Sequence, residues 1–171
     1  MIDSSWLSRF VRPNQCTWCT EVGDRIVVKA GPTELQQRGP IITVLISHTS
    51  DEITEAKSVG FEFPRSRPFS ALIDTGAAVT IINPQLAETY KLRYIGPEHI
   101  TALDNTGLYP GYAAAISFPD RALRGFDPIR IIACPLASAS MSCLIGRDIL
   151  RHWDFTYHGQ SGEFTIRDLR Q

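Results

Sequence analysis

The chain of 171 residues carries 17 basic and 18 acidic side chains, and 43% of its residues are hydrophobic. These values predict one globular domain with a core of ordinary size and exclude a wholly disordered chain. A formal net charge of -1 and a longest hydrophobic run of only Tyr112 to Ile116 exclude dedicated nucleic-acid binders and membrane-spanning helices, so we expect neither nucleic acid nor membrane as a partner.

Residues 1–39 are expected to form an N-terminal extension ahead of one domain over residues 40–171. The aromatic residues of the extension follow no period, and residues 26–28 predict one short strand there. The N-terminus has no basic segment leading into a long apolar stretch, so it does not resemble a secretory signal. Four cysteines, including the pair Cys16 and Cys19, do not resemble a secreted disulfide framework, and we expect a cytoplasmic protein.

A buried strand and a short helix are expected in residues 40–60. The segment 41–46 is β-branched and apolar and follows a Gly-Pro turn, which is typical of a buried strand. Thr49 and Glu52 have the spacing of a capping box, and Gly60 suits the end of a helix. One short helix is therefore predicted between these positions.

Two further strands are predicted at residues 69–73 and 79–82. Directly after them, Asn83 and Pro84 are typical of a helix N-cap and of the first helical position. A helix is therefore expected from this point to Tyr90.

The remainder of the chain predicts mostly short strands. Residues 100–103 and 112–118 indicate a hairpin whose tip contains Asp104, Asn105, Thr106 and Gly107. Later elements are expected as strands at 128–134 and 143–146, a helix at 148–153, and a hairpin with Phe155 and Tyr157 opposite Phe164 and Ile166. Many short strands with few short helices predict a mainly β fold.

The sharpest chemical feature is the run Asp74-Thr75-Gly76-Ala77, which directly follows the predicted strand 69–73. A carboxylate placed so close to core strands needs a functional or structural reason. The structural alternative is an aspartate that caps a turn between two strands. A short motif of this kind occurs by chance in many chains, so by itself it does not assign a function.

A second motif follows about seventy residues later as Leu144-Ile145-Gly146-Arg147-Asp148. With both motifs in this order, and a predicted hairpin between them, residues 40–168 resemble the retropepsin-like aspartic proteases, and most closely their bacterial, single-lobed members. The resemblance implies a closed β-barrel of the acid-protease type, with a flap hairpin and short helices, and an endopeptidase that uses no cofactor.

Aspartic proteases activate a water molecule with one carboxylate while the other carboxyl group acts as an acid. This chain contains a single Asp-Thr-Gly and is too short for two such lobes. The second carboxylate must then come from Asp74 of another copy, so we expect a homodimer that acts on a polypeptide substrate.

The resemblance also assigns roles to individual residues. Asp74 is expected to be catalytic, with Thr75, Gly76 and Ala77 forming its loop. Thr80, Gly146, Arg147 and Asp148 are expected to support that loop, with a hydrogen bond between Thr80 and Asp148. The substrate pocket is expected to contain Ile81, Leu144, Leu103 and Gly107.

One departure from the retroviral pattern concerns Arg147. Retroviral members carry an aspartate directly after the alanine of the motif, and that aspartate pairs with the arginine of the second motif. This chain has Ala78 there, so the partner of Arg147 stays open.

The sequence offers two alternatives to the protease. Cys16 and Cys19 have the spacing of half a zinc site, but no second pair follows and the histidines show no ligand pattern, so no metal is expected. A non-catalytic module of the same fold, which holds an extended peptide or supports assembly without cutting, is the alternative function. The intact Asp-Thr-Gly favours the protease.

Overall fold

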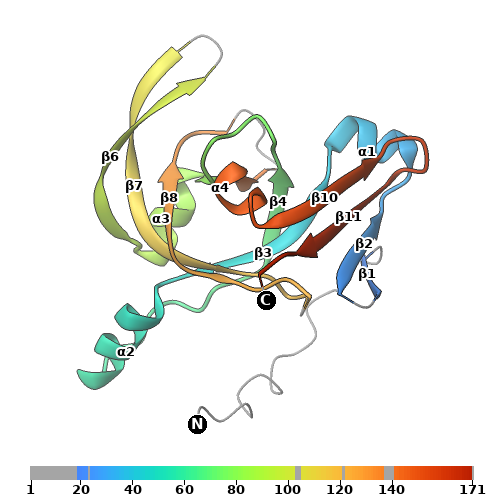
Figure 1. Cartoon of the computed structure of the whole chain (residues 1–171). Helices are drawn as coiled ribbons and strands as arrows, with labels where there is room; N and C mark the ends of the chain where they lie inside the picture. Colours follow the sequence, from blue (N-terminus) through green and yellow to red (C-terminus); the bar gives the residue numbers. More distant parts are fainter. Residues whose placement is uncertain (1–18, 23, 103–104, 121, 137–140, 171) are drawn as a thin grey trace.

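The structure is a computed structural model that describes residues 19–22, 24–102, 105–120, 122–136 and 141–170. As the sequence predicts, these residues form a mainly β fold with short helices (Figure 1). In chain order the elements are β1 (Cys19–Val22), β2 (Arg25–Lys29), α1 (Pro32–Arg38), β3 (Ile41–Ser47), α2 (Ser50–Ser58), β4 (Phe69–Ile73), β5 (Ile81–Ile82), α3 (Pro84–Tyr90), β6 (Arg93–Ala102), β7 (Asn105–Ser117), β8 (Phe126–Ala133), β9 (Cys143–Ile145), α4 (Arg147–Leu150), β10 (Trp153–His158) and β11 (Glu163–Asp168).

The described strands form two sheets. The smaller sheet has the antiparallel order β1-β2-β11-β10. The larger has the order β3-β4-β9-β5-β8-β7-β6, and a further pairing between β3 and β7 joins six of its strands into a ring. The pairs β4–β9 and β5–β8 are parallel, whereas the others are antiparallel. The ring encloses a core that includes Ile42, Val44, Ile73, Ile82, Ile131 and Ile145.

The segment predicted as an N-terminal extension contributes to this core. Ile26, Val28 and Leu35 are at most 3% exposed and pack in the same hydrophobic cluster as the ring strands. The short strand expected at 26–28 is confirmed as the centre of β2, which pairs with β11. The domain boundary at residue 39 stays a prediction, and residues 1–18 lie outside the described part.

Both predicted helix caps are confirmed. At α2 the Thr49 hydroxyl accepts from the Glu52 backbone N–H, and the Glu52 carboxylate accepts in return from the Thr49 backbone N–H. At α3 the Asn83 side chain accepts from the Gln85 N–H, and Pro84 opens the helix. Capping side chains satisfy backbone N–H groups that have no partner within the helix.

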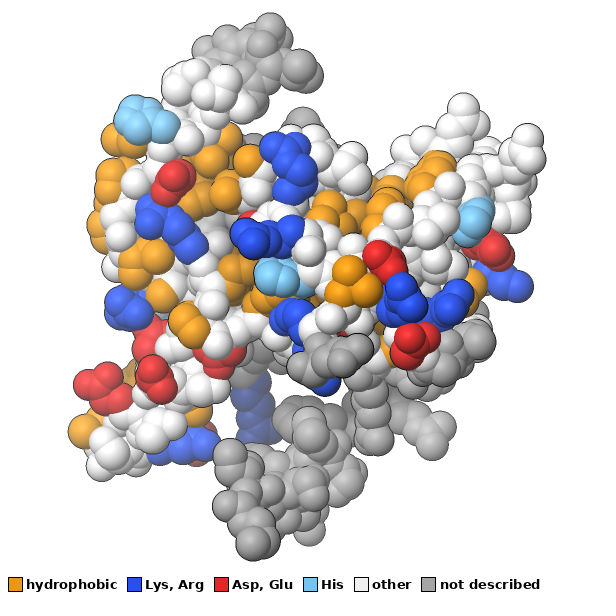
Figure 2. Space-filling view, in the orientation of Figure 1, with side chains coloured by type: hydrophobic (Ala, Val, Ile, Leu, Met, Phe, Trp, Pro, Cys, Tyr) orange, Lys and Arg blue, Asp and Glu red, His pale blue; other side chains and the backbone are white. Residues whose placement is uncertain are grey.

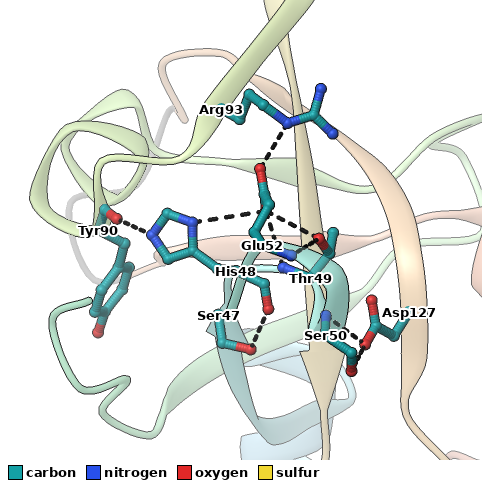
Figure 3. Close-up of polar contacts among 8 residues, drawn as sticks. All are labelled: Ser47, His48, Thr49, Ser50, Glu52, Tyr90, Arg93 and Asp127. Atoms are coloured by element: carbon teal, nitrogen blue, oxygen red, sulfur yellow. Dashed lines mark hydrogen bonds and ion pairs between the residues drawn. The ribbon is translucent and has the colours of Figure 1, made fainter. Parts of the chain in front are cut away.

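A buried histidine connects α2, the end of α3 and the start of β6 (Figure 3). The Nε2–H group of His48 donates to the Tyr90 carbonyl over 2.7 Å, and its Nδ1 lies 3.6 Å from a carboxylate oxygen of Glu52. Glu52 also accepts from Arg93 Nε over 2.6 Å. Burial alone would raise the pKa of Glu52, but hydrogen bonds from Thr49 and Arg93 lower it below its ordinary value. The contacts fix the base of the hairpin that begins at Arg93.

The β6–β7 hairpin is far longer than the two short strands that the sequence predicts. Its register runs from Arg93 opposite Ala113 to Ala102 opposite Asn105, with an irregularity between Tyr94 and Gly96. Prolines normally interrupt internal strands because they lack a backbone N–H, but edge strands tolerate them. Here Pro97 lies in the edge strand β6 and faces Pro110 of β7 beyond the last β7–β8 pair. At that position Pro110 needs no backbone N–H to bond to β8.

The C-terminus is held by an ion pair next to β11. Asp168 has a side chain only 4% exposed, and it accepts from the backbone N–H of Arg124 and from the backbone and guanidinium of Arg170. The Arg170 guanidinium stacks on the Phe126 ring, 3.7 Å from its centroid. Burial alone would raise the pKa of Asp168, but these hydrogen bonds and the Arg170 charge lower it to about 2.

We expect Asp168 to contribute about 2 kcal/mol to the free energy of unfolding at neutral pH, because folding lowers its pKa from 3.8 to about 2. A carboxyl group with a lowered folded-state pKa stabilises above its unfolded pKa, so this contribution is lost as the pH falls from about 4 to about 2. Urea denaturation of the wild type and of Asp168→Asn at about pH 7 and about pH 2.5 checks this. The stability difference between them should shrink at the lower pH, and an equal difference at both would contradict the assignment.

Candidate active site

Four neighbouring strands present one row of apolar side chains on the side of the sheet opposite the core. In register, Leu72 of β4 lies beside Leu144 of β9, which lies beside Ile81 of β5, which lies beside Ile132 of β8. Side chains at paired positions share a face of a sheet, and alternate positions along each strand share it too. Leu72, Leu144 and Ile81 are partly exposed. We call this surface the cleft face.

Asp74 stands two residues beyond Leu72, at the end of β4. Its backbone N–H donates to the Ile145 carbonyl over 3.0 Å, which ties the start of the loop to β9. Its Oδ1 accepts from the Gly76 N–H over 2.8 Å, a hydrogen bond that orients the carboxylate. The Asp74 side chain is partly exposed, and Thr75 and Gly76 are exposed in the single chain. The loop thus presents an oriented carboxylate at an open surface.

The partner of Arg147, which the sequence left open, is the backbone of this same loop. Its guanidinium donates to the carbonyls of Thr75 over 2.8 Å and of Gly76 over 3.1 Å. The Arg147 backbone N–H also donates to the Ala77 carbonyl over 2.9 Å. The Nη1 group of Arg147 carries two N–H donors and reaches both carbonyls, so Arg147 holds the loop without an aspartate at position 78.

Thr80, Gly146 and Asp148 form a compact group beneath the loop. The expected hydrogen bond is present, with Thr80 Oγ1 donating to Asp148 Oδ1 over 2.8 Å and the Thr80 N–H donating to Asp148 Oδ2 over 2.9 Å. Thr80 Oγ1 also accepts from the Gly146 N–H over 3.2 Å. A Cβ atom on Gly146 would lie 2.4 Å from the carbonyl carbon of Val79, so this approach requires glycine.

Replacing Thr80 by valine is expected to lower the free energy of unfolding by about 1–3 kcal/mol. Thr80 is fully buried, and valine matches its shape but leaves an Asp148 oxygen and the Gly146 N–H without their Thr80 partner. Thr80→Ser is the matched control, since it keeps the hydroxyl and removes one methyl group. Urea denaturation should show a smaller loss for serine, and a larger loss for serine than for valine would contradict this role.

The structure places the predicted pocket residues in different parts of the molecule. Ile81 and Leu144 are register partners on the cleft face, next to the strand that leads to Asp74. Gly107 lies in β7 opposite Ile100, in the outer part of the hairpin. Leu103 lies outside the described residues. The loop residues Thr75, Gly76 and Ala77 and the group of Thr80, Gly146, Arg147 and Asp148 are brought together around Asp74.

Outside this site, the described part offers neither an accessible thiol at Cys143 nor a cluster of metal-ligating side chains. Cys143 is fully buried, and burial, together with the charge of Asp148, raises the pKa of its thiol well above the usual range. Within the described ranges, no three His, Cys, Asp or Glu side chains gather in a way that would hold a metal ion. Cys16 lies outside the described residues. No described helix has the length and apolar character needed to cross a membrane.

Comparison with known proteins gave matches to a family model and to solved structures. A family model described as retroviral aspartyl protease matches residues 36–158. Among solved structures, the chain is similar to a retropepsin-like aspartic protease from Rickettsia conorii, with 13% sequence identity and a TM-score of 0.40. That match covers 75% of this chain and 92% of the other. The comparison with curated proteins gave no significant match.

Proposed function

Since the chain belongs to the retroviral aspartyl protease family, we propose that it is an aspartic endopeptidase whose active site forms between two copies. The observation that carries the proposal is the carboxylate of Asp74, oriented by the Gly76 N–H at the exposed end of β4. One such carboxylate is present per Asp-Thr-Gly loop, and the sequence contains one loop. A second copy of the chain, related to the first by a two-fold axis, supplies the second carboxylate.

The chemistry needs two carboxyl groups in different protonation states. Two carboxylates that share a site do not both ionise, because like charges at short distance repel. The ionised one takes a proton from a water molecule, which attacks the peptide carbonyl carbon, while the protonated one donates to the carbonyl oxygen. The exposed Thr75 and Gly76 leave this loop free to meet its counterpart in a partner copy.

The hairpin β6–β7 is proposed to act as a flap over the bound peptide. We define the flap as residues 97–102 and 105–110, which extend beyond the β7–β8 pairing (Figure 1). Hydrophobic side chains gather over this hairpin on the left of Figure 2, and Tyr94 and Leu108 are more than half exposed. The half-buried Leu72, Leu144 and Ile81 of the cleft face favour substrates with apolar residues beside the cut bond.

A mixing experiment tests the two-copy site. Purified wild-type chain is incubated with a diverse peptide library, and increasing amounts of Asp74→Asn chain are added under conditions that allow subunits to exchange. Mixed dimers contain one catalytic carboxylate, so cleavage per wild-type chain should fall as the variant is added, whereas added wild-type chain should not lower it. Sedimentation at the same concentrations reports the dimer, and full activity of a strictly monomeric species would refute the proposal. Peptide binding without cleavage would instead indicate a non-catalytic module.

A further inference from the structure

The cleft face continues from β8 across the two strands of the β6–β7 hairpin. Ile132 of β8 is the register partner of Gly111 in β7, and Gly111 is in turn the register partner of Gly96 in β6. The strand order β8-β7-β6 makes β6 an edge strand of the larger sheet (Figure 1). Two glycines therefore face each other where the row of apolar side chains ends, and neither covers the sheet with a side chain of its own.

The side chain of Arg130 covers Gly111. Arg130 lies two residues before Ile132 in β8, so the two side chains leave the same face of the sheet. A Cβ atom on Gly111 would lie 3.0 Å from Nη2 and 3.2 Å from Nε of Arg130, and 2.9 Å from the Gly96 carbonyl oxygen. The guanidinium thus occupies the space that a side chain at position 111 would fill, and this allows it to cross β7.

The guanidinium reaches two groups of β6 on the far side of β7. Its Nη2 donates to the Pro97 carbonyl over 3.3 Å and lies 2.8 Å from a carboxylate oxygen of Glu98. Both residues belong to the flap and follow Gly96 directly. Arg130 therefore connects β8 to the edge strand of the flap across the strand between them. We call Arg130, Pro97 and Glu98 the arginine bridge.

The arginine bridge lies where the flap separates from the ring of strands. Gly111 opposite Ile132 is the last β7–β8 pair, and beyond it the described flap residues pair only within their own hairpin. The Arg130 and Glu98 side chains are 43% and 41% exposed, and an exposed ion pair by itself contributes little to stability. A modest contribution matters at this position, because a change of strand direction here displaces the whole flap beyond it.

We propose that Arg130 is a positioning residue for peptide cleavage, which holds the edge strand of the flap at Pro97 and Glu98 and so sets the position in which the flap covers a bound peptide. The inference rests on the proposed endopeptidase function and deepens it, because it names the contact that fixes the flap relative to the cleft face. Loss of the bridge leaves Asp74 intact. It should weaken the binding of substrate and of transition state alike, which raises KM and leaves kcat nearly unchanged.

The kinetic arm is a double-mutant cycle in the full chain. Arg130→Gln should raise KM by about 2- to 10-fold, and Glu98→Gln by about 1.5- to 5-fold, each with little change in kcat. In the Arg130→Gln background, Glu98→Gln should have no further effect, because its partner is already absent. The matched control is Arg167→Gln, which breaks the Arg167–Asp154 pair of the smaller sheet. Arg167 is 44% exposed, and its loss should leave KM unchanged.

The second arm needs no catalysis and measures amide hydrogen exchange by mass spectrometry. In Arg130→Gln and in Glu98→Gln, the amides of the flap should exchange faster than in the wild type, whereas those of β10 and β11 should not change.

Unchanged exchange in the flap, or faster exchange without any change in KM, would overturn the proposal. An equal effect of Glu98→Gln on KM in both backgrounds would also contradict it, since Arg130 would then act without Glu98. A wild-type chain that cleaves no peptide would refute the endopeptidase itself, whereas unchanged flap exchange in an active enzyme would refute the arginine bridge alone.

Discussion

The variant Asp74→Asn is expected to cleave peptides at least about 100-fold more slowly in kcat/KM than the wild type. Asparagine has nearly the same shape as aspartate, and its amide oxygen can still accept from the Gly76 N–H, so the loop geometry should persist. The asparagine amide does not act as a base in water, so the group that takes a proton from the attacking water is lost. Replacing two facing carboxyl groups by amides also removes charge repulsion, and the dimer should not weaken.

Steady-state cleavage of one peptide, together with circular dichroism and sedimentation, checks this prediction. The matched control is Asp51→Asn, an exposed aspartate in the first turn of α2. It changes the same functional group on the surface and should leave cleavage unchanged. Cleavage by Asp74→Asn at nearly the wild-type rate would show that the chemistry resides elsewhere in the molecule.

Replacing Gly146 by alanine is expected to lower the free energy of unfolding by about 3 kcal/mol and to remove most of the activity. The backbone of Gly146 is extended, with φ at -87°, so alanine meets no conformational penalty. The cost is steric, because the new Cβ would lie 2.4 Å and 2.5 Å from the carbonyl carbon and oxygen of Val79 and 2.9 Å from Asp148 Oδ1. Relief requires β9 or the segment before Thr80 to move, and both support the Asp74 loop.

The matched control for this change is Gly159→Ala. Gly159 is an exposed turn residue, and a Cβ there would meet an atom of the Tyr157 ring at 3.2 Å, a longer contact than those at Gly146, and one with a side chain rather than the backbone. Urea denaturation and peptide cleavage of both variants separate a local steric effect from a general glycine effect. Equal stability of Gly146→Ala and wild type would show that the backbone around Gly146 adjusts to the extra carbon atom at little energetic cost.

The elements that could be predicted from the sequence are those with local signals. The capping box at Thr49, the Asn83-Pro84 helix start and the apolar segment 69–73 each encode their structure within a few residues. The strand expected at 79–82 is confirmed only at Ile81 and Ile82, because the backbone N–H of Thr80 is used by the Asp148 carboxylate. Competition of this kind depends on a residue 68 positions away.

The Asp-Thr-Gly motif could be recognised in the sequence, but the side chain that holds its loop through carbonyl groups could not be predicted. Arg147 is satisfied by carbonyl groups, which every residue carries, so no side-chain pattern could indicate that partner. The length of the hairpin could not be predicted either. Pro97 and Pro110 indicate interrupted strands unless their position beyond the β7–β8 pairing is known.

The parallel pairing of β4 with β9 sets the order in which a growing polypeptide acquires this structure. Ile73 pairs with Ile145, and the Asp74 backbone N–H binds the Ile145 carbonyl, so the loop lacks its floor until the second motif has left the ribosome. Likewise β2 can pair with β11 only after β11 has been synthesised, and Val28 is then the register partner of Phe164. Contacts between such distant residues form late, because closing a long loop costs entropy. A nascent chain therefore carries the Asp-Thr-Gly sequence without its supporting floor until β9 has been synthesised.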